Sequence, residues 1–216
     1  LGIELQYQQL EVVMRVIATI LLILWSSTSL ASTAGDPERG KSLTETCVAC
    51  HNDDGNSSVS LWPKIAGQHE GYLYKQLLAF HEGESGPRYD PNMYAMLSGF
   101  NQQDLQDLSS YYASQKMSLG KASADLYELG QALYRGGDIQ SRIPACIGCH
   151  EARGLGNEPA NFPRLSGQNE EYTAQQLKQY RDGARETDPN EIMRDIASRM
   201  TDQQIEAVSN YVAGLY

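Results

Sequence analysis

Apolar side chains recur at helical spacing near the end of each half of the chain. In the segments Gln103–Gln115 and Gln203–Leu215 they fall at positions i, i+3, i+6 and i+7, which places them on one face of a helix. The residues concerned are Leu105, Leu108, Tyr111 and Tyr112, followed in the second segment by Ile205, Val208, Tyr211 and Val212. Leu73, Leu77 and Phe80 form another such stripe, with a weaker copy at Leu177 and Tyr180. No run alternates as a strand does, so the pattern predicts an all-α fold.

The two halves of the chain are copies of one another. WPKIAGQ (62–68) matches FPRLSGQ (162–168), and YLYKQLLAFHEG (72–83) matches YTAQQLKQYRDG (172–183). The offset is 100 residues over these segments. The repeat predicts a tandem duplication of a unit of about ninety residues, a size that can fold alone. We place the domains at residues 34–118 and 119–216.

The N-terminal segment has the composition of an export signal. Arg15 precedes an apolar run, Val16–Trp25, which small residues follow. Residues 1–33 are therefore predicted to be an N-terminal extension and signal peptide that is removed. The alternative is an uncleaved membrane anchor, although the run is about half as long as a membrane span needs.

The charge balance narrows the class of partner. The whole chain has a net charge of −10, and residues 34–216 carry 16 basic and 25 acidic residues. No basic stripe is present to follow a phosphate backbone, so no nucleic-acid partner is expected. An acidic surface instead predicts basic docking partners and association that weakens with salt.

All four cysteines lie in two Cys-x-x-Cys-His motifs, TCVACH (46–51) and ACIGCH (145–150). Two cysteines at this spacing reach two vinyl groups on one edge of a porphyrin, and the next histidine projects over the ring; the motif is typical of c-type haem attachment. It predicts two covalent haem c groups. The attaching residues are Cys47 and Cys50, then Cys146 and Cys149, and the proximal iron ligands are His51 and His150. A zinc site and a pair of structural disulfides are the alternatives.

Methionine is a common second ligand of haem iron. Met93 lies 42 residues after His51 and Met193 lies 43 residues after His150, so this repeat-matched pair is favoured. Met96, one helical turn further on, is the main alternative in the first domain. Pro63 and Pro163 follow the two histidines by 12 and 13 residues, and their carbonyl groups are candidate acceptors for the second imidazole N–H.

Two further histidines, His69 and His81, align with Asn169 and Arg181 in the second half. Since neither belongs to a duplicated pattern, we predict that both are solvated surface residues rather than ligands.

These motifs, together with YYASQKMSLG at the junction, resemble the cytochrome c4 group of dihaem c-type cytochromes over essentially all of residues 34–216. The resemblance implies two class I cytochrome c domains related by a pseudo-twofold axis. It also implies His51 with Met93 and His150 with Met193 as axial pairs, and a helix crossing at Gly40 and at Gly130, near Tyr111 and Tyr211.

The expected function is single-electron transfer in the periplasm, without catalysis. A membrane donor complex and a terminal oxidase or reductase are the expected partners, and peripheral membrane association is left open. Six-coordinate iron has no site for a substrate, which favours a carrier. The alternatives are a dihaem peroxidase and the cytochrome subunit of a larger dehydrogenase complex.

Overall fold

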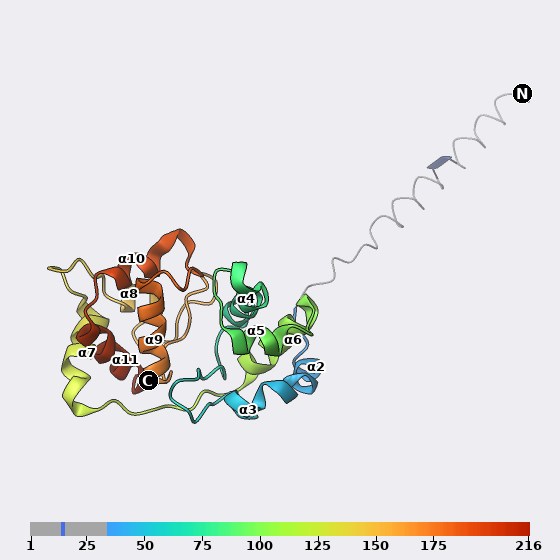
Figure 1. Ribbon diagram of the computed structural model, residues 1–216, viewed down its shortest axis with the longest axis horizontal. Coiled ribbons are helices and arrows are strands. Elements are labelled where there is room, and N and C mark those ends of the chain that lie inside the picture. Colours follow the sequence, from blue (N-terminus) through green and yellow to red (C-terminus); the bar gives the residue numbers. More distant parts are fainter. Residues whose placement is uncertain (1–13, 16–33) are drawn as a thin grey trace, which may run out of the picture. The chain divides into compact units, whose positions relative to one another are not determined.

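Two sets of helices, one from each half of the chain, make up the described part of the protein (Figure 1). The computed structural model describes residues 14–15 and 34–216. The predicted N-terminal extension and signal peptide therefore lies outside the described residues, apart from Met14 and Arg15. Over these ranges no helix combines the length and the apolar composition that crossing a membrane requires.

The order of helices is the same in both halves. The first half contains α2 (Pro37–Ser42), α3 (Val48–His51), α4 (Glu70–His81), α5 (Pro91–Leu97) and α6 (Gln102–Ser114). The second half contains α7 (Ala124–Gly136), α8 (Ile147–His150), α9 (Glu170–Arg181), α10 (Ile192–Ser198) and α11 (Asp202–Ala213). Three short 3₁₀ turns accompany them: η1 (Thr44–Thr46), η2 (Gly83–Ser85) and η3 (Pro189–Glu191). Within residues 34–216 the only β pairing is in isolated bridges, so the all-α prediction is confirmed.

The last helix of each half begins with a capping box. Asn101 accepts hydrogen bonds from the backbone of α6, while the Asp104 carboxylate accepts one from the Asn101 N–H. Thr201 and Gln204 form the same reciprocal pair at the start of α11. These side chains satisfy N–H groups that have no partner within the helix.

The first and last helices of each half cross at a glycine. A Cβ atom added to Gly40 in α2 would lie 2.0 Å from the Asp107 carbonyl oxygen, and one added to Gly130 in α7 would lie 2.1 Å from that of Ala207. The Tyr111 and Tyr211 side chains flank these contacts. Only glycine permits so close an approach, so the expected crossings are present in both halves.

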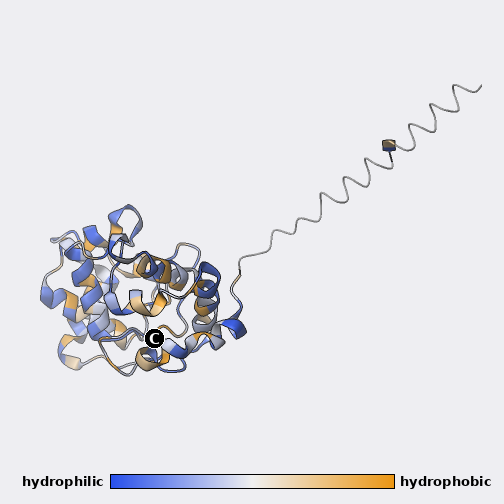
Figure 2. Ribbon diagram, turned by 45° about the vertical axis from the view of Figure 1, so that its right-hand side comes forward, coloured by the Kyte–Doolittle hydropathy of each residue, from blue (hydrophilic) through white to orange (hydrophobic). Residues whose placement is uncertain are grey.

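Each half has its own apolar core, and the predicted helix faces are the ones that are buried. In the first half the core centres on Leu73, Leu108 and Tyr112. The second core is larger and contains Tyr134, Ile143, Met200, Ile205, Val208, Tyr211, Val212 and Leu215. Figure 2 shows that the helices contain both apolar and polar residues, as helices with one buried face do.

Reciprocal hydrogen bonds join the two halves. Gln168 accepts from the Lys64 N–H at 2.8 Å and donates to the Lys64 carbonyl at 2.7 Å. Gln68 makes the equivalent pair with Arg164, at 2.8 and 2.9 Å. Matched residues thus exchange equivalent contacts, which is the arrangement of a two-fold relation between the halves.

Candidate functional site

Each Cys-x-x-Cys-His motif forms a single helical turn. Cys47 precedes α3 and Cys146 precedes α8, and the histidine ends the turn in both cases. The His51 N–H donates to the Cys47 carbonyl at 2.9 Å, and the His150 N–H donates to the Cys146 carbonyl at the same distance. The turn therefore presents two thiols and an imidazole from one short rigid segment.

The four cysteines are unpaired in the structure. Burial raises the pKa of the Cys146 thiol to about 11 and also raises the pKa of Cys47. Both sulfur atoms pack against the apolar core of their own half. A neutral sulfur in an apolar wall suits a thioether better than a metal-bound thiolate, which carries a negative charge.

His51 and His150 are buried, and both rings are held in the same way. Nδ1 of His51 lies 2.9 Å from the Pro63 carbonyl oxygen, and Nδ1 of His150 lies 2.9 Å from that of Pro163. Because a carbonyl oxygen only accepts, Nδ1 carries the proton and donates it, which leaves the Nε2 lone pair for a metal. Burial lowers the pKa of both histidines, so both are neutral near pH 7.

The candidate distal ligands occupy matched helices. Met93 lies in the first turn of α5 and Met193 in the first turn of α10, and both side chains are half-buried. The Asp90 carboxylate caps α5 and accepts from the Met93 N–H at 3.0 Å. Met96 is 47% exposed, whereas Met117 and Met200 are buried core residues. Met193 is the one methionine in α10, whereas α5 contains both Met93 and Met96.

Haem fits the side chains that are present. Each half supplies two unpaired thiols, a neutral imidazole with a free Nε2 and a methionine on the helix that precedes its last helix. In the first half the buried Tyr112 hydroxyl lies beside the Cys47 sulfur and has no oxygen or nitrogen partner among the described residues. Among residues 14–15 and 34–216, no cluster of three His, Cys, Asp or Glu side chains is arranged to hold a metal ion, so the zinc alternative has no ligand set there.

Known proteins share this arrangement along most of the chain. A family model described as cytochrome c matches twice, at residues 37–116 and 127–215. Cytochrome c4 of Azotobacter vinelandii is 44% identical over 209 residues, which cover 94% of this chain and 99% of that protein. The chain belongs to the cytochrome c4 family.

The solved structures agree with this membership. Reduced recombinant cytochrome c4 from Pseudomonas stutzeri matches with a TM-score of 0.83 at 43% identity, covering 85% of this chain and all of that chain. The fold is thus a pair of cytochrome c domains, and the chain carries two covalently bound haem c groups. As a cytochrome c4 it is an electron-transfer protein and not an enzyme, which sets aside the peroxidase alternative.

A second group of relatives is named for a different role. The thiosulfate dehydrogenase electron acceptor of Thiomonas intermedia is 35% identical over 207 residues, covering 91% of this chain and 88% of that protein. This similarity gives the dehydrogenase-associated alternative a specific relative.

Sequence reasoning about the remaining polar residues was less complete. His69 was predicted to be solvated, but its Nε2 atom is buried and has no partner among the described residues, so that prediction is wrong. The sequence did not single out Arg88 and Arg185, two buried arginines between the halves. Since 97 residues separate them instead of the 100 of the repeat, aligning the halves does not pair them.

Proposed function

We propose that this cytochrome c4 is a periplasmic one-electron carrier in which His51 and Met93, and His150 and Met193, are the axial ligands. The observation that carries the proposal is the hydrogen bond from each motif histidine to a proline carbonyl, repeated at 2.9 Å in both halves. Haem iron supplies a reversible one-electron couple when it is bound. The side chains that hold the haem determine its ligands, its orientation and its access to outside molecules.

The protein's own residues confine the chemistry to electron transfer. The four cysteines attach the two haem groups covalently. The carbonyl groups of Pro63 and Pro163 fix the orientation of the two imidazoles. The thioethers of Met93 and Met193 close the distal sides, raise the potential and exclude outside ligands. The hydrogen-bonded contact between Gln168 and Lys64 keeps the two halves at a fixed separation, as transfer between them requires.

Export and charge define the partners of the carrier. Residues 1–33 carry the features of a signal peptide, which supports periplasmic localisation. A membrane complex would act as donor and a terminal oxidase or reductase as acceptor. Residues 34–216 have a net charge of −9, which favours basic docking surfaces and predicts transfer rates that fall as salt is raised.

A second candidate partner follows from the similarity to a thiosulfate dehydrogenase electron acceptor. In that case the same carrier accepts electrons from a dehydrogenase, either as a free protein or as its cytochrome subunit. The chemistry of the two haem sites is unchanged, and only the docking partner differs.

Carbon monoxide tests the axial ligands, because it binds reduced haem only where the distal position is open. We expect no adduct with the native protein near pH 7 and one adduct per chain for Met93→Leu and for Met193→Leu. Met96→Leu is the matched control, with the same change three residues from Met93, and should bind none. An adduct in Met96→Leu, or none in Met93→Leu, would contradict the assignment in the first domain.

A further inference from the structure

A buried tyrosine in the first half carries a hydroxyl that the fold leaves without an oxygen or nitrogen partner. Tyr112 lies in α6 and belongs to the apolar core of its half, where it is 3% exposed. Within residues 14–15 and 34–216 its hydroxyl oxygen is buried and unsatisfied by any such group. Since most buried polar groups are hydrogen-bonded, this one requires an explanation.

The hydroxyl faces the haem-attachment motif of its own half. Cys47 packs against the core cluster that Tyr112 forms with Leu73 and Leu108, and its sulfur lies beside the Tyr112 hydroxyl. Burial raises the pKa of Tyr112, and the Cys47 sulfur raises it further, so the hydroxyl keeps its proton. Tyr112 is therefore a donor at every physiological pH.

A second hydroxyl approaches the same sulfur from outside the core. Oγ1 of Thr46 lies 3.9 Å from Sγ of Cys47, but the Thr46 side chain is exposed. Water competes for an exposed hydroxyl, whereas no water competes for a buried one. The buried donor, Tyr112, is thus expected to have the larger influence on Cys47.

The second half offers its cysteine neither hydroxyl. In the repeat Tyr112 corresponds to Val212 and Thr46 to Ala145, and neither side chain can donate. The buried tyrosine of that half, Tyr134, directs its hydroxyl to the Glu151 carbonyl at 2.6 Å. The two attachment sites therefore differ in the polarity around the first cysteine of the motif.

Haem attachment determines which group donates. The Cys47 sulfur of a thioether has no proton and is only an acceptor, so the Tyr112 hydroxyl must be the donor. Because sulfur is a weak acceptor, the contact adds little to stability. Its consequence is electrostatic, since the positive end of the O–H dipole is directed at an atom bonded to the haem.

We propose that Tyr112 donates a hydrogen bond to the Cys47 thioether and raises the reduction potential of the first haem relative to the second. This inference rests on the proposed carrier function. The positive end of a dipole disfavours the oxidised iron, which carries one more positive charge than the reduced iron. The contact therefore shifts the distribution of a single electron toward the first haem.

Redox titration of the intact dihaem protein, with the two haems resolved by NMR, tests the proposal. Tyr112→Phe removes only the hydroxyl, and we expect it to shift the first haem toward the oxidised form by about threefold, or ~28 mV for one electron. The second haem should not shift. Tyr111→Phe is the matched control, one residue earlier in α6. Its hydroxyl donates to the Asp53 carbonyl at 3.1 Å, and its loss should leave both potentials unchanged.

Resonance Raman spectroscopy separates a hydrogen bond from an effect of packing. After exchange into D₂O the Tyr112 hydroxyl carries a deuteron, so a C–S stretching band of the native protein should shift. Tyr112→Phe should lose this isotope shift. Thr46→Ala introduces the residue found in the second half, and it should move the first potential less than Tyr112→Phe does.

Four results would overturn the contact. Tyr112→Phe moves neither potential; it moves both potentials equally; the native protein shows no isotope shift that the variant loses; or Thr46→Ala has the larger effect. Carbon monoxide binding reports separately on the axial ligands. An adduct with the native protein would count against the proposed ligation and not against the role of Tyr112.

Discussion

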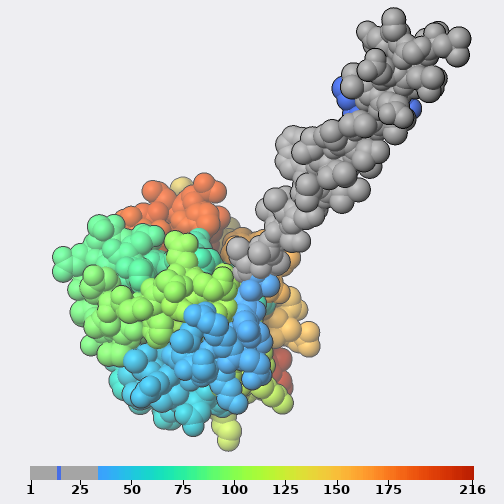
Figure 3. All heavy atoms as spheres, turned by 90° about the vertical axis from the view of Figure 1, so that its right-hand side faces the viewer, coloured from blue at the N-terminus to red at the C-terminus, as the bar shows by residue number. Residues whose placement is uncertain are grey.

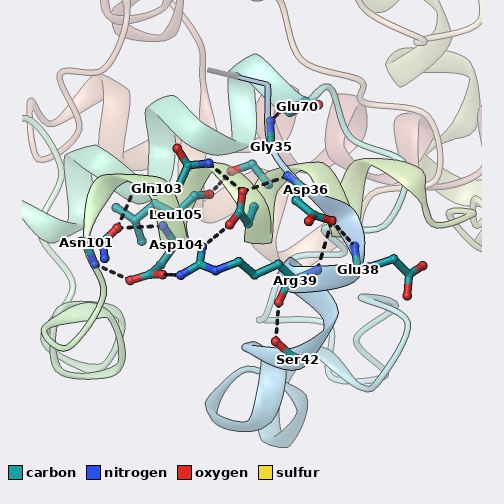
Figure 4. Close-up of polar contacts among 12 residues, drawn as sticks. Gly35, Asp36, Glu38, Arg39, Ser42, Glu70, Asn101, Gln103, Asp104 and Leu105 are labelled. Atoms are coloured by element: carbon teal, nitrogen blue, oxygen red, sulfur yellow. Dashed lines mark hydrogen bonds and ion pairs between the residues drawn. The ribbon is translucent and has the colours of Figure 1, made fainter. Parts of the chain in front are cut away.

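The first and second halves share a helix order, yet they hold their terminal helices together by different means. In the first half the contact is polar: Arg39 of α2 pairs with both Asp104 and Asp107 of α6 (Figure 4). Asp107 also accepts from the Asp36 N–H at 2.8 Å. Figure 3 shows the face formed mainly by this half, where the blue segment containing α2 lies against the light-green helix α6.

In the second half aromatic side chains fill the equivalent place. The ring of Tyr211 lies 5.4 Å from that of Tyr127 and 5.5 Å from that of Tyr134, centre to centre. Asp107 corresponds to Ala207 in the repeat, so the buried carboxylate has no counterpart there. Helix α7 is also longer than α2, with 13 residues against 6, and supplies more apolar surface.

The glycine at the helix crossing is common to the two halves, whereas the side chains around it differ. Both halves keep a glycine at the crossing, because the helix backbones meet there. The side chains around the crossing differ in kind, since either an ion-pair cluster or stacked rings can stabilise the same helix pair.

The largest effect should come from the glycines. Gly40→Ala and Gly130→Ala each place a Cβ within about 2 Å of a backbone oxygen, and we expect a loss of ~1–3 kcal/mol or more in the free energy of unfolding. Chemical denaturation of the holoprotein measures this loss. Gly136→Ala is the control, since its Cβ would contact nothing within 4 Å. A tolerated substitution at only one crossing would show that the two contacts are not equivalent.

A smaller effect on the free energy of unfolding is expected from removing the hydroxyl groups of two buried tyrosines. The Tyr134 hydroxyl donates to the Glu151 carbonyl at 2.6 Å, whereas that of Tyr112 has no partner among the described residues. Tyr134→Phe should therefore lower the free energy of unfolding by ~1 kcal/mol. Tyr112→Phe removes an unpaired buried hydroxyl and should be neutral or stabilising. Denaturation of the two variants in parallel measures the contrast, and equal losses would contradict it.

The smallest effect is a loss of stability at acid pH that involves Asp107 in the first half. Burial disfavours the Asp107 carboxylate, but hydrogen bonds from Asp36, Gln103 and Arg39 outweigh burial and lower its pKa. As the pH falls, Asp107 becomes protonated in the unfolded chain before it does so in the folded protein. The stabilisation that the Asp107 carboxylate gives the folded protein is therefore complete above about pH 4 and declines as the pH falls further. Hydrogen exchange should show α2 and α6 opening at acid pH before α7 and α11.

Asp107→Asn is the control for the acid response. It removes the titrating group while keeping an oxygen that can accept from Asp36. The variant should therefore lose the earlier opening of α2 and α6 at acid pH. Selective opening of α2 and α6 in Asp107→Asn would assign the response to another group.

The sequence by itself determined the features that depend on neighbours along the chain. Helical periodicity predicted the faces of α6 and α11, and Cys-x-x-Cys-His predicted two haem attachments, because three-residue spacing fixes the thiols on one turn. The repeat predicted the duplication and singled out Pro63 and Pro163. Whether Met93 and Met193 ligate iron stays a prediction that the carbon monoxide experiment addresses.

Only the tertiary structure decided which distant groups meet. It placed the carbonyl of each proline against the ring of a buried histidine, and it buried the Nε2 atom of His69, a residue that the alignment had assigned to the surface. It also joined Arg88 and Arg185 through glutamines from both halves. Burial and pairing of charge depend on how the two halves pack, and no local pattern encodes the positions of groups about a hundred residues apart in sequence.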